Sequence, residues 1–295
     1  MRTVGLLGVP MDLGQERRGV DMGPSAIRYA GVEQCLLDLN YAVTDYGDIV
    51  VRGRCPSQVG DKNLKNVASV VEASLRVKER VKGMLGDGVF PLILGGDHSI
   101  SIGTLAAIND SKKNLGIIWY DAHGDLNTPE TSPSGNIHGM PLAVNLGLGH
   151  SLLTSIGPNK IKPENIVLIG IRSLDDGEKA LIHKLGIKAF TMHEIDKIGM
   201  TAVMEQTIDH LKGTDGVHLS LDLDALDPIE CPGVGTPVRG GITYRESHLA
   251  MELLADSNLI TSAEFVEVNP IVDDCNKTAE VAVALIGSLF GAKLL

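Results

Sequence analysis

The sequence predicts an α/β fold in which helices cover both faces of a largely parallel sheet. Short apolar runs alternate along the 295 residues with segments of helical periodicity, as in doubly wound folds. Hydrophobic residues make up 43% of the chain and aromatic ones only 3%, so Val, Ile, Leu and Ala build the core, as suits a buried sheet. Neither a linker nor a fixed-period repeat divides the chain, and we expect one domain over residues 1–295.

The first half of the chain predicts four strands and three helices. The apolar run 3–9 is a strand, and Pro24 in a first turn supports a helix over 24–40. The partly alternating stretch 41–49 is a second strand. Asp61 or Asn63 caps a helix that runs to about Met84, where apolar residues recur near helical spacing. Strands at 89–94 and 115–120 enclose a helix at 100–109, as in a right-handed crossover.

The second half continues the alternation after a polar loop at 127–139. That loop is rich in Thr, Ser, Pro and Gly and shows no periodicity, so it is a place to expect substrate contacts. Apolar runs predict strands at 165–171, 188–191, 217–223 and 260–268. Helical segments are expected at 141–146, 177–185, 201–212, 244–254 and 276–290.

Asp121, His123 and Asp125 follow the strand at 115–120 at alternate positions, so their side chains point the same way. Such a group is costly to desolvate without a cation, which indicates a metal site rather than a solvated loop. Asp222 and Asp224 repeat the pattern at the end of another strand. A third strand runs through a glycine turn into 97–99, which contains His98. Ligands bind at this carboxyl edge in open α/β sheets.

Charge and cysteine usage narrow the class of protein. The net charge of −11 disfavours nucleic acid and membrane partners, because both need basic surfaces. Cys35, Cys55, Cys231 and Cys275 form no C-x-x-C pair, which argues against disulfides and thiolate zinc and fits a reducing compartment. No signal-peptide pattern is present, and the apolar stretch 281–290 is far shorter than the about 20 residues of a membrane span. We expect a cytoplasmic protein.

Three motifs carry a resemblance to a known family. GGDHS at 95–99, DAHGDLN at 121–127 and SLDLDALDP at 220–228 resemble the ureohydrolase superfamily. TSPSGNIHG at 131–139 resembles its arginase family in particular, bacterial branch, and the likeness covers nearly the whole chain. The resemblance implies a three-layer α/β/α domain with a central eight-stranded parallel sheet, and homo-oligomers, trimers or hexamers. It implies hydrolysis of L-arginine to L-ornithine and urea, by attack of a hydroxide bridging two Mn²⁺ ions on the guanidinium carbon.

The resemblance also implies roles for individual residues. Six side chains would hold two Mn²⁺ ions per subunit, with Asp121 and Asp222 bridging: His98 and Asp125 complete one ion, His123 and Asp224 the other. Asp125 would also carry a proton from the nucleophile, His138 would shuttle protons, and Glu267 would face the guanidinium. The amino-acid end of the substrate would contact Asn127, Ser134, Asn136, Asp175, Glu178 and Thr236.

Several alternatives stay open at this point. Ligand type favours Mn²⁺ but also admits Fe²⁺, Co²⁺ and Ni²⁺. Asp97 and Asp227 fit supporting or capping roles, and Asp176 competes with Asp175. The chain departs from the family at Ala225, where glycine is frequent, and at Cys231. An agmatinase, or a catalytically silent binding protein on the same fold, is the rival interpretation.

Overall fold

The computed structural model describes residues 3–53 and 63–294, and one eight-stranded sheet forms its centre. The strand order is β2-β1-β3-β8-β7-β4-β5-β6, and every pairing is parallel. The strands are β1 (Thr3–Val9), β2 (Ala42–Asp48), β3 (Phe90–Gly95), β4 (Gly116–Tyr120), β5 (Ile166–Ile171), β6 (Lys188–Thr191), β7 (Val217–Asp222) and β8 (Ile260–Val266).

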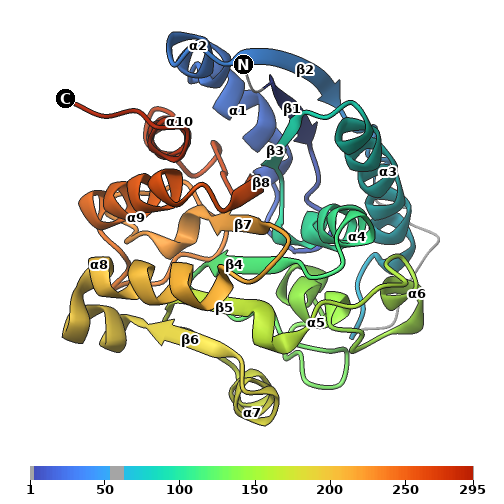
Figure 1. Ribbon diagram of the computed structural model, residues 1–295. Helices are drawn as coiled ribbons and strands as arrows, with labels where there is room; N and C mark the ends of the chain where they lie inside the picture. The colour runs from blue at the N-terminus through green and yellow to red at the C-terminus, as the bar shows by residue number, and fades with distance from the viewer. Residues whose placement is uncertain (1–2, 54–62, 295) are drawn as a thin grey trace.

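Helices cover both faces of the sheet and complete the three layers (Figure 1). One face carries α1 (Gly23–Tyr29), α2 (Val32–Asp38), α8 (Met192–Leu211), α9 (Tyr244–Ser257) and α10 (Lys277–Leu289). The other carries α3 (Val67–Gly86), α4 (Ser101–Ser111), α5 (Pro141–Asn145), α6 (Ser151–Thr154) and α7 (Asp176–Leu185). None of the helices in the described ranges is both long enough and apolar enough to cross a bilayer.

Strands β1, β3, β4 and β5 divide their side chains between two hydrophobic cores. In β4, Ile118 and Tyr120 pack into the core beneath α9, whereas Ile117 and Trp119 pack into the core beneath α4. This is the period of two expected of a strand that is buried on both faces. The predicted fold class is therefore confirmed.

All eight predicted strands are present, but some helix boundaries differ from the prediction. The expected helix 24–40 is two helices, because Gly31 adopts a left-handed φ of 94° between them. Helix α3 begins only after Asn66; of its two predicted caps, Asp61 lies outside the described residues, as does Cys55. Helix α8 begins at Met192, not 201, and its path is interrupted at Gly199, whose φ is 80°.

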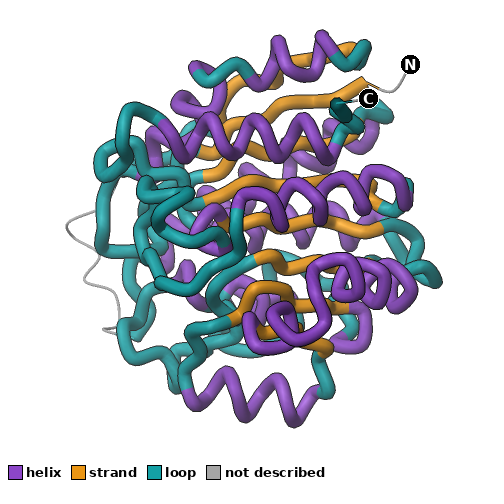
Figure 2. Tube along the Cα trace, turned by 90° about the vertical axis from the view of Figure 1, so that its left-hand side faces the viewer, coloured by secondary structure: helices purple, strands orange, loops and turns teal. Residues whose placement is uncertain are grey.

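The strand order places the strands that lead to the predicted site residues side by side. Strands β3, β8, β7 and β4 are consecutive neighbours in the middle of the sheet, although they are far apart in sequence. The chain enters β1 at the right of Figure 2, so the parallel strands all end at the left, where loops gather. Four strand ends thus deliver their polar residues to one edge, as expected of a ligand site in such a fold.

Candidate metal centre and substrate pocket

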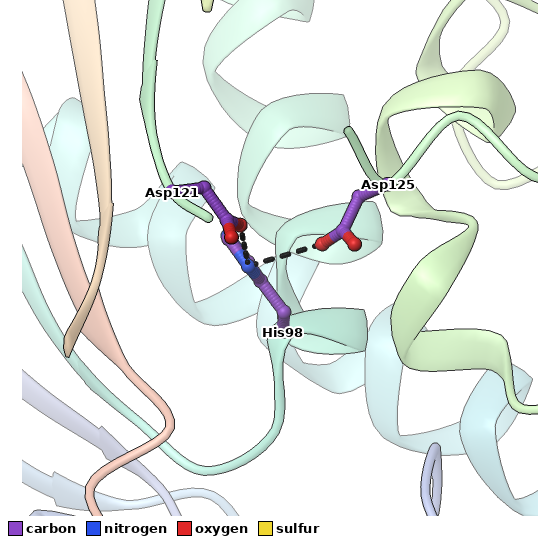
Figure 3. Close-up of side chains that lie close together, drawn as sticks. All are labelled: His98, Asp121 and Asp125. Carbon is purple, nitrogen blue, oxygen red and sulfur yellow. Dashed lines mark ion pairs between the residues drawn. The ribbon is translucent and has the colours of Figure 1, made fainter. Parts of the chain in front are cut away.

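The ring of His98 points into a ring of carboxylates at the carboxyl edge of the sheet. Its Nδ1 lies 3.0 Å from Asp121 Oδ2, 3.1 Å from Asp125 Oδ2 and 3.2 Å from Asp222 Oδ2. Figure 3 shows two of these approaches. The imidazole stacks on Trp119 with 4.1 Å between ring centroids, which fixes the plane of the ring.

A second group of ligand atoms adjoins the first and shares Asp121 with it. His123 Nδ1 lies 3.1 Å from Asp224 Oδ2 and 3.4 Å from Asp121 Oδ1. His98, Asp121 and Asp125 form one cation-sized cluster, and Asp121, His123 and Asp224 form the other. The two oxygens of Asp121 face different imidazoles, which is the geometry required of a carboxylate that bridges two ions.

The arrangement of these side chains is better explained by bound metal ions than by hydrogen bonds among the side chains themselves. His98 Nδ1 and Asp121 Oδ2 are buried without a hydrogen-bond partner, despite their proximity. Four buried carboxylates on two imidazoles leave excess negative charge, and buried charge is costly unless it is compensated. Oxygen and imidazole donors without thiolate suit Mn²⁺ and similar divalent ions. The donor set therefore meets the requirements of a pair of such ions.

Burial and the charges of neighbouring groups together shift the pKa values of these side chains. Burial lowers the pKa of His98, but the three surrounding carboxylates outweigh it and raise this pKa well above its usual value. Burial raises the pKa of Asp125 to about 6, and the charge of Asp121 acts in the same direction. Burial also raises the pKa of Asp121, but the imidazoles of His123 and His98 outweigh it and lower this pKa.

Local backbone contacts orient the carboxylates. Asp121 Oδ1 accepts the backbone N–H of His123 at 2.7 Å, and Asp222 Oδ1 accepts that of Asp224 at 2.7 Å. Each i to i+2 bond turns the second carboxylate oxygen of the acceptor toward the site. Asp125 has a φ of 50°, a left-handed conformation that costs a non-glycine residue about 1 kcal/mol or more and is characteristic of functional sites.

Glu267 and His138 form a buried pair beside the metal ligands. Glu267 Oε1 lies 3.1 Å from His138 Nδ1 and accepts the backbone N–H of His98 at 3.0 Å. Its Oε2 accepts Gln15 Nε2 at 2.7 Å. Burial lowers the pKa of His138, but the hydrogen bond and charge of Glu267 outweigh burial and raise it to about 9. Glu267 itself has a φ of 67°, a second strained backbone at the site.

A cavity opens above these groups and contains most of the predicted substrate contacts. Asp121, Asp224 and Glu267 lie beneath its wall rather than in it. The other eleven residues predicted to bind or react line the cavity, together with Gly139 and Ser173: His98, His123, Asp125, Asn127, Ser134, Asn136, His138, Asp175, Glu178, Asp222 and Thr236.

Hydrogen bonds tie the predicted contact residues to one another. Asn127 Nδ2 donates to Asp175 Oδ2 at 2.8 Å. Glu178 accepts the backbone N–H groups of Asp175 and Leu126, at 2.9 and 3.0 Å, and thereby anchors the loop to the start of α7. Burial raises the pKa of Glu178 to about 7, against the lowering effect of these two bonds. Thr236 Oγ1 donates to Asp224 Oδ2 at 2.9 Å, so Thr236 supports a metal ligand as well as shaping the loop.

The sequence analysis missed a buried polar layer beneath the metal site. Ser220 Oγ donates to Glu264 Oε1 at 2.8 Å and lies 2.8 Å from His98 Nε2. His218 Nε2 lies 3.4 Å from the same Glu264 oxygen, and all these groups are at most 1% exposed. The sequence did contain a signal for this layer, because the polar His218 and Ser220 alternate with apolar residues in β7, where a strand buried on both faces would otherwise be apolar throughout. Gln15, the partner of Glu267, had no such signal, because its loop is irregular.

Three further expectations concern residues around the ligands. Asp97 accepts the N–H groups of Ser99 and Gly14, and Asp227 accepts those of Ile229, Gly240 and Gly241, as supporting roles require. Ala225, at a position where the family often has glycine, does not have a positive φ, so the alanine is not strained there. Cys231 is fully buried, and burial raises the pKa of its thiol.

A three-layer α/β/α fold with imidazole and carboxylate ligands gathered at the carboxyl edge of its sheet defines a metal-dependent hydrolase. The chain belongs to the arginase family, whose model matches residues 2–291. It is 63% identical to the arginase of Bacillus caldovelox and 60% identical to that of Bacillus subtilis, covering 100% of this chain and at least 99% of each relative. The crystal structure of the Bacillus caldovelox arginase superposes with a TM-score of 0.98 at 62% identity, with both chains covered completely.

Proposed function

We propose that the protein hydrolyses L-arginine to L-ornithine and urea and uses two Mn²⁺ ions per subunit. One observation carries this proposal: the same cavity is lined by candidate metal ligands and by the polar side chains of Asn127, Ser134 and Asn136. The first set suits the activation of water. The second offers neutral donors to an amino-acid carboxylate. The names of the full-length relatives support the same substrate.

His98, Asp121, His123, Asp125, Asp222 and Asp224 would hold the ions. When bound, the ions would lower the pKa of a water molecule to about 7 and supply a nucleophile near neutral pH. In the reaction, the water oxygen bonds to the guanidinium carbon, and the bond from this carbon to the chain nitrogen breaks. The departing amine must gain a proton that the water loses.

The protein's own groups account for the movement of this proton. Asp125 lines the cavity between His98 and the polar loop and offers a carboxylate oxygen that can accept the proton of the nucleophile. His138 lies at the wall, with 17% of its side chain exposed, so it can exchange a proton with solvent. Its partner Glu267 stabilises the protonated imidazole and offers a planar carboxylate beside the position proposed for the guanidinium.

Asp175 and Glu178 supply the negative charge proposed to face the substrate ammonium. Both line the cavity on the side of α7, and the backbone N–H of Asp175 donates a hydrogen bond to the carboxylate of Glu178. Asn127 is held by Asp175 at 2.8 Å, so the proposed contacts to carboxylate and ammonium are mechanically linked. A substrate with both groups therefore matches this wall better than one with a single group.

Urea release from L-arginine tests the function directly. The purified protein is stripped with chelator, then assayed with and without added Mn²⁺, and the assay is repeated with agmatine, which has the guanidinium but lacks the carboxylate. We expect Mn²⁺-dependent turnover of arginine with a kcat/KM about 10⁴-fold above that of agmatine, because agmatine would leave the donors of Asn127, Ser134 and Asn136 without a carboxylate partner. Equal turnover of arginine and agmatine would favour an agmatinase-like activity. If neither compound were turned over, a binding role would be favoured.

Comparison of Mn²⁺ with Fe²⁺, Co²⁺ and Ni²⁺ in the same assay tests the choice of metal. Assembly into trimers or hexamers, a cytoplasmic location and a single domain over residues 1–295 stay predictions.

A further inference from the structure

Lys65 lies directly behind the polar loop of the cavity and contacts it twice. Its backbone N–H donates to Gly135 O at 3.0 Å, and its Nζ donates to Asn136 Oδ1 at 3.3 Å. The same ammonium pairs with Glu16 Oε1 at 2.7 Å, and one-third of the lysine side chain is exposed. Lys65 does not line the cavity, whereas Asn136 does. The lysine therefore acts on the cavity through the asparagine and through its charge.

The ammonium determines which end of the Asn136 amide faces the cavity. A lysine ammonium has three donors and no acceptor, so only the amide oxygen can face it. The orientation of an asparagine side chain follows from its hydrogen-bonding partners. With Oδ1 held by Lys65, the amino group of Asn136 is the end left for other partners. That end donates, which is the property a carboxylate requires of its partner.

The charge of Lys65 also balances an otherwise acidic wall. Among the described residues that line the cavity there is no Lys or Arg, whereas two acidic residues outside the proposed metal ligands, Asp175 and Glu178, do line it. A substrate carboxylate that enters the cavity is repelled by these groups unless positive charge lies near its binding position. Lys65 is a cation in hydrogen-bonding contact with the wall at that position. Its partner Glu16 is 72% exposed and Lys65 33%, so solvent screens the carboxylate more than the ammonium, and part of the positive charge still acts on the wall.

We propose that Lys65 is a specificity-determining residue that selects substrates with an α-carboxylate. It positions the Asn136 amide as a donor and adds positive potential behind the polar loop. This inference rests on the proposed function of the same cavity, which it deepens. It assigns to Lys65 a positioning role, without contact to the reacting atoms.

The test replaces Lys65 by methionine, which keeps most of the side-chain length and removes the charge and the donors. We expect kcat/KM for L-arginine to fall about 10-fold, chiefly through KM, because a hydrogen bond to a charged group is lost. For agmatine, kcat/KM should change less than twofold, since agmatine has no carboxylate that could bind to Asn136. Lys65→Arg should recover most of the loss. Lys293→Met is the matched control. That lysine pairs with Asp256, just before the start of β8 and so at the edge of the sheet opposite the cavity, and its replacement should leave kcat/KM for both substrates unchanged.

Two results would overturn the proposal. An equal fall for arginine and agmatine would make Lys65 a support of the loop only, and an unchanged preference would remove it from recognition altogether. A binding measurement tests the role of Lys65 independently of the proposed reaction, because binding requires no turnover. Isothermal titration with L-ornithine and with putrescine, its analogue without a carboxylate, should show weaker binding of ornithine alone in Lys65→Met. Identical ornithine affinity in both proteins would contradict the role of Lys65 even if no urea were ever formed.

Discussion

Asp121 belongs to both clusters of ligand atoms, so its removal should affect metal binding more than the removal of a ligand of one cluster. Asp121→Ala takes a carboxylate from each cluster, whereas Asp224→Ala takes one from the second cluster only. A ligand that binds only the folded state at 100 times its Kd stabilises that state by about 2.7 kcal/mol. Two independent ions would therefore contribute about 5 kcal/mol.

Thermal unfolding converts these free energies into a measurable shift. For a chain of this size, 1 kcal/mol corresponds to about 2 °C in Tm, so saturating Mn²⁺ should raise Tm by about 10 °C in the unaltered protein. The shift should fall to about 5 °C in Asp224→Ala and to nearly zero in Asp121→Ala. Differential scanning fluorimetry across a Mn²⁺ titration, with the metal content of each variant measured after gel filtration, gives both quantities.

A control variant distinguishes lost ligands from a damaged fold. Asp227 is an acid near the site whose carboxylate accepts only backbone N–H groups, from Ile229, Gly240 and Gly241, in its hydrogen bonds. Asp227→Ala should lower Tm without Mn²⁺ yet keep the full metal-induced shift. If Asp121→Ala still bound two ions and kept the full Mn²⁺-induced shift in Tm, Asp121 would not be a ligand shared by both ions. If Asp224→Ala lost the whole shift, the two ions would not bind at separable positions.

Three further outcomes follow from the same structure. Replacement of His138 by Asn should slow turnover and flatten its dependence on solvent buffer while leaving the metal content intact; a drop in bound metal would instead identify His138 as a ligand. Asn136→Ala should reduce the preference for arginine over agmatine, and an unchanged ratio of their kcat/KM values would exclude Asn136 from carboxylate recognition. Phe265 is fully buried in β8, so Phe265→Ala should cost about 3–5 kcal/mol in urea-induced unfolding, and a loss below about 1 kcal/mol would contradict its packing.

Local patterns in the sequence were sufficient for the strands and for most ligand candidates. A parallel strand that is buried on both faces is a short apolar run, and the half-exposed strand β2 was identified from its partial alternation instead, so all eight strands were predicted. Helix boundaries were less accurate, since a single left-handed residue can end or interrupt a helix. Gly31 and Gly199 do so, and nothing in their neighbouring residues distinguishes them from glycines tolerated within a helix.

The fold class and the ligand types could be predicted from the sequence, because periodicity and residue chemistry are local properties. The spacing of Asp121, His123 and Asp125 was enough to place them on one side of the chain. The neighbouring positions of β3, β8, β7 and β4 could not be predicted in this way, since strand order depends on long-range packing. That order brings Glu264 beneath His98 through Ser220, by contacts that span 44 and 122 positions, and the tertiary fold also brings Lys65 to Asn136, 71 positions away. Such contacts leave no periodic trace in the sequence, because each partner's local pattern is satisfied without the other.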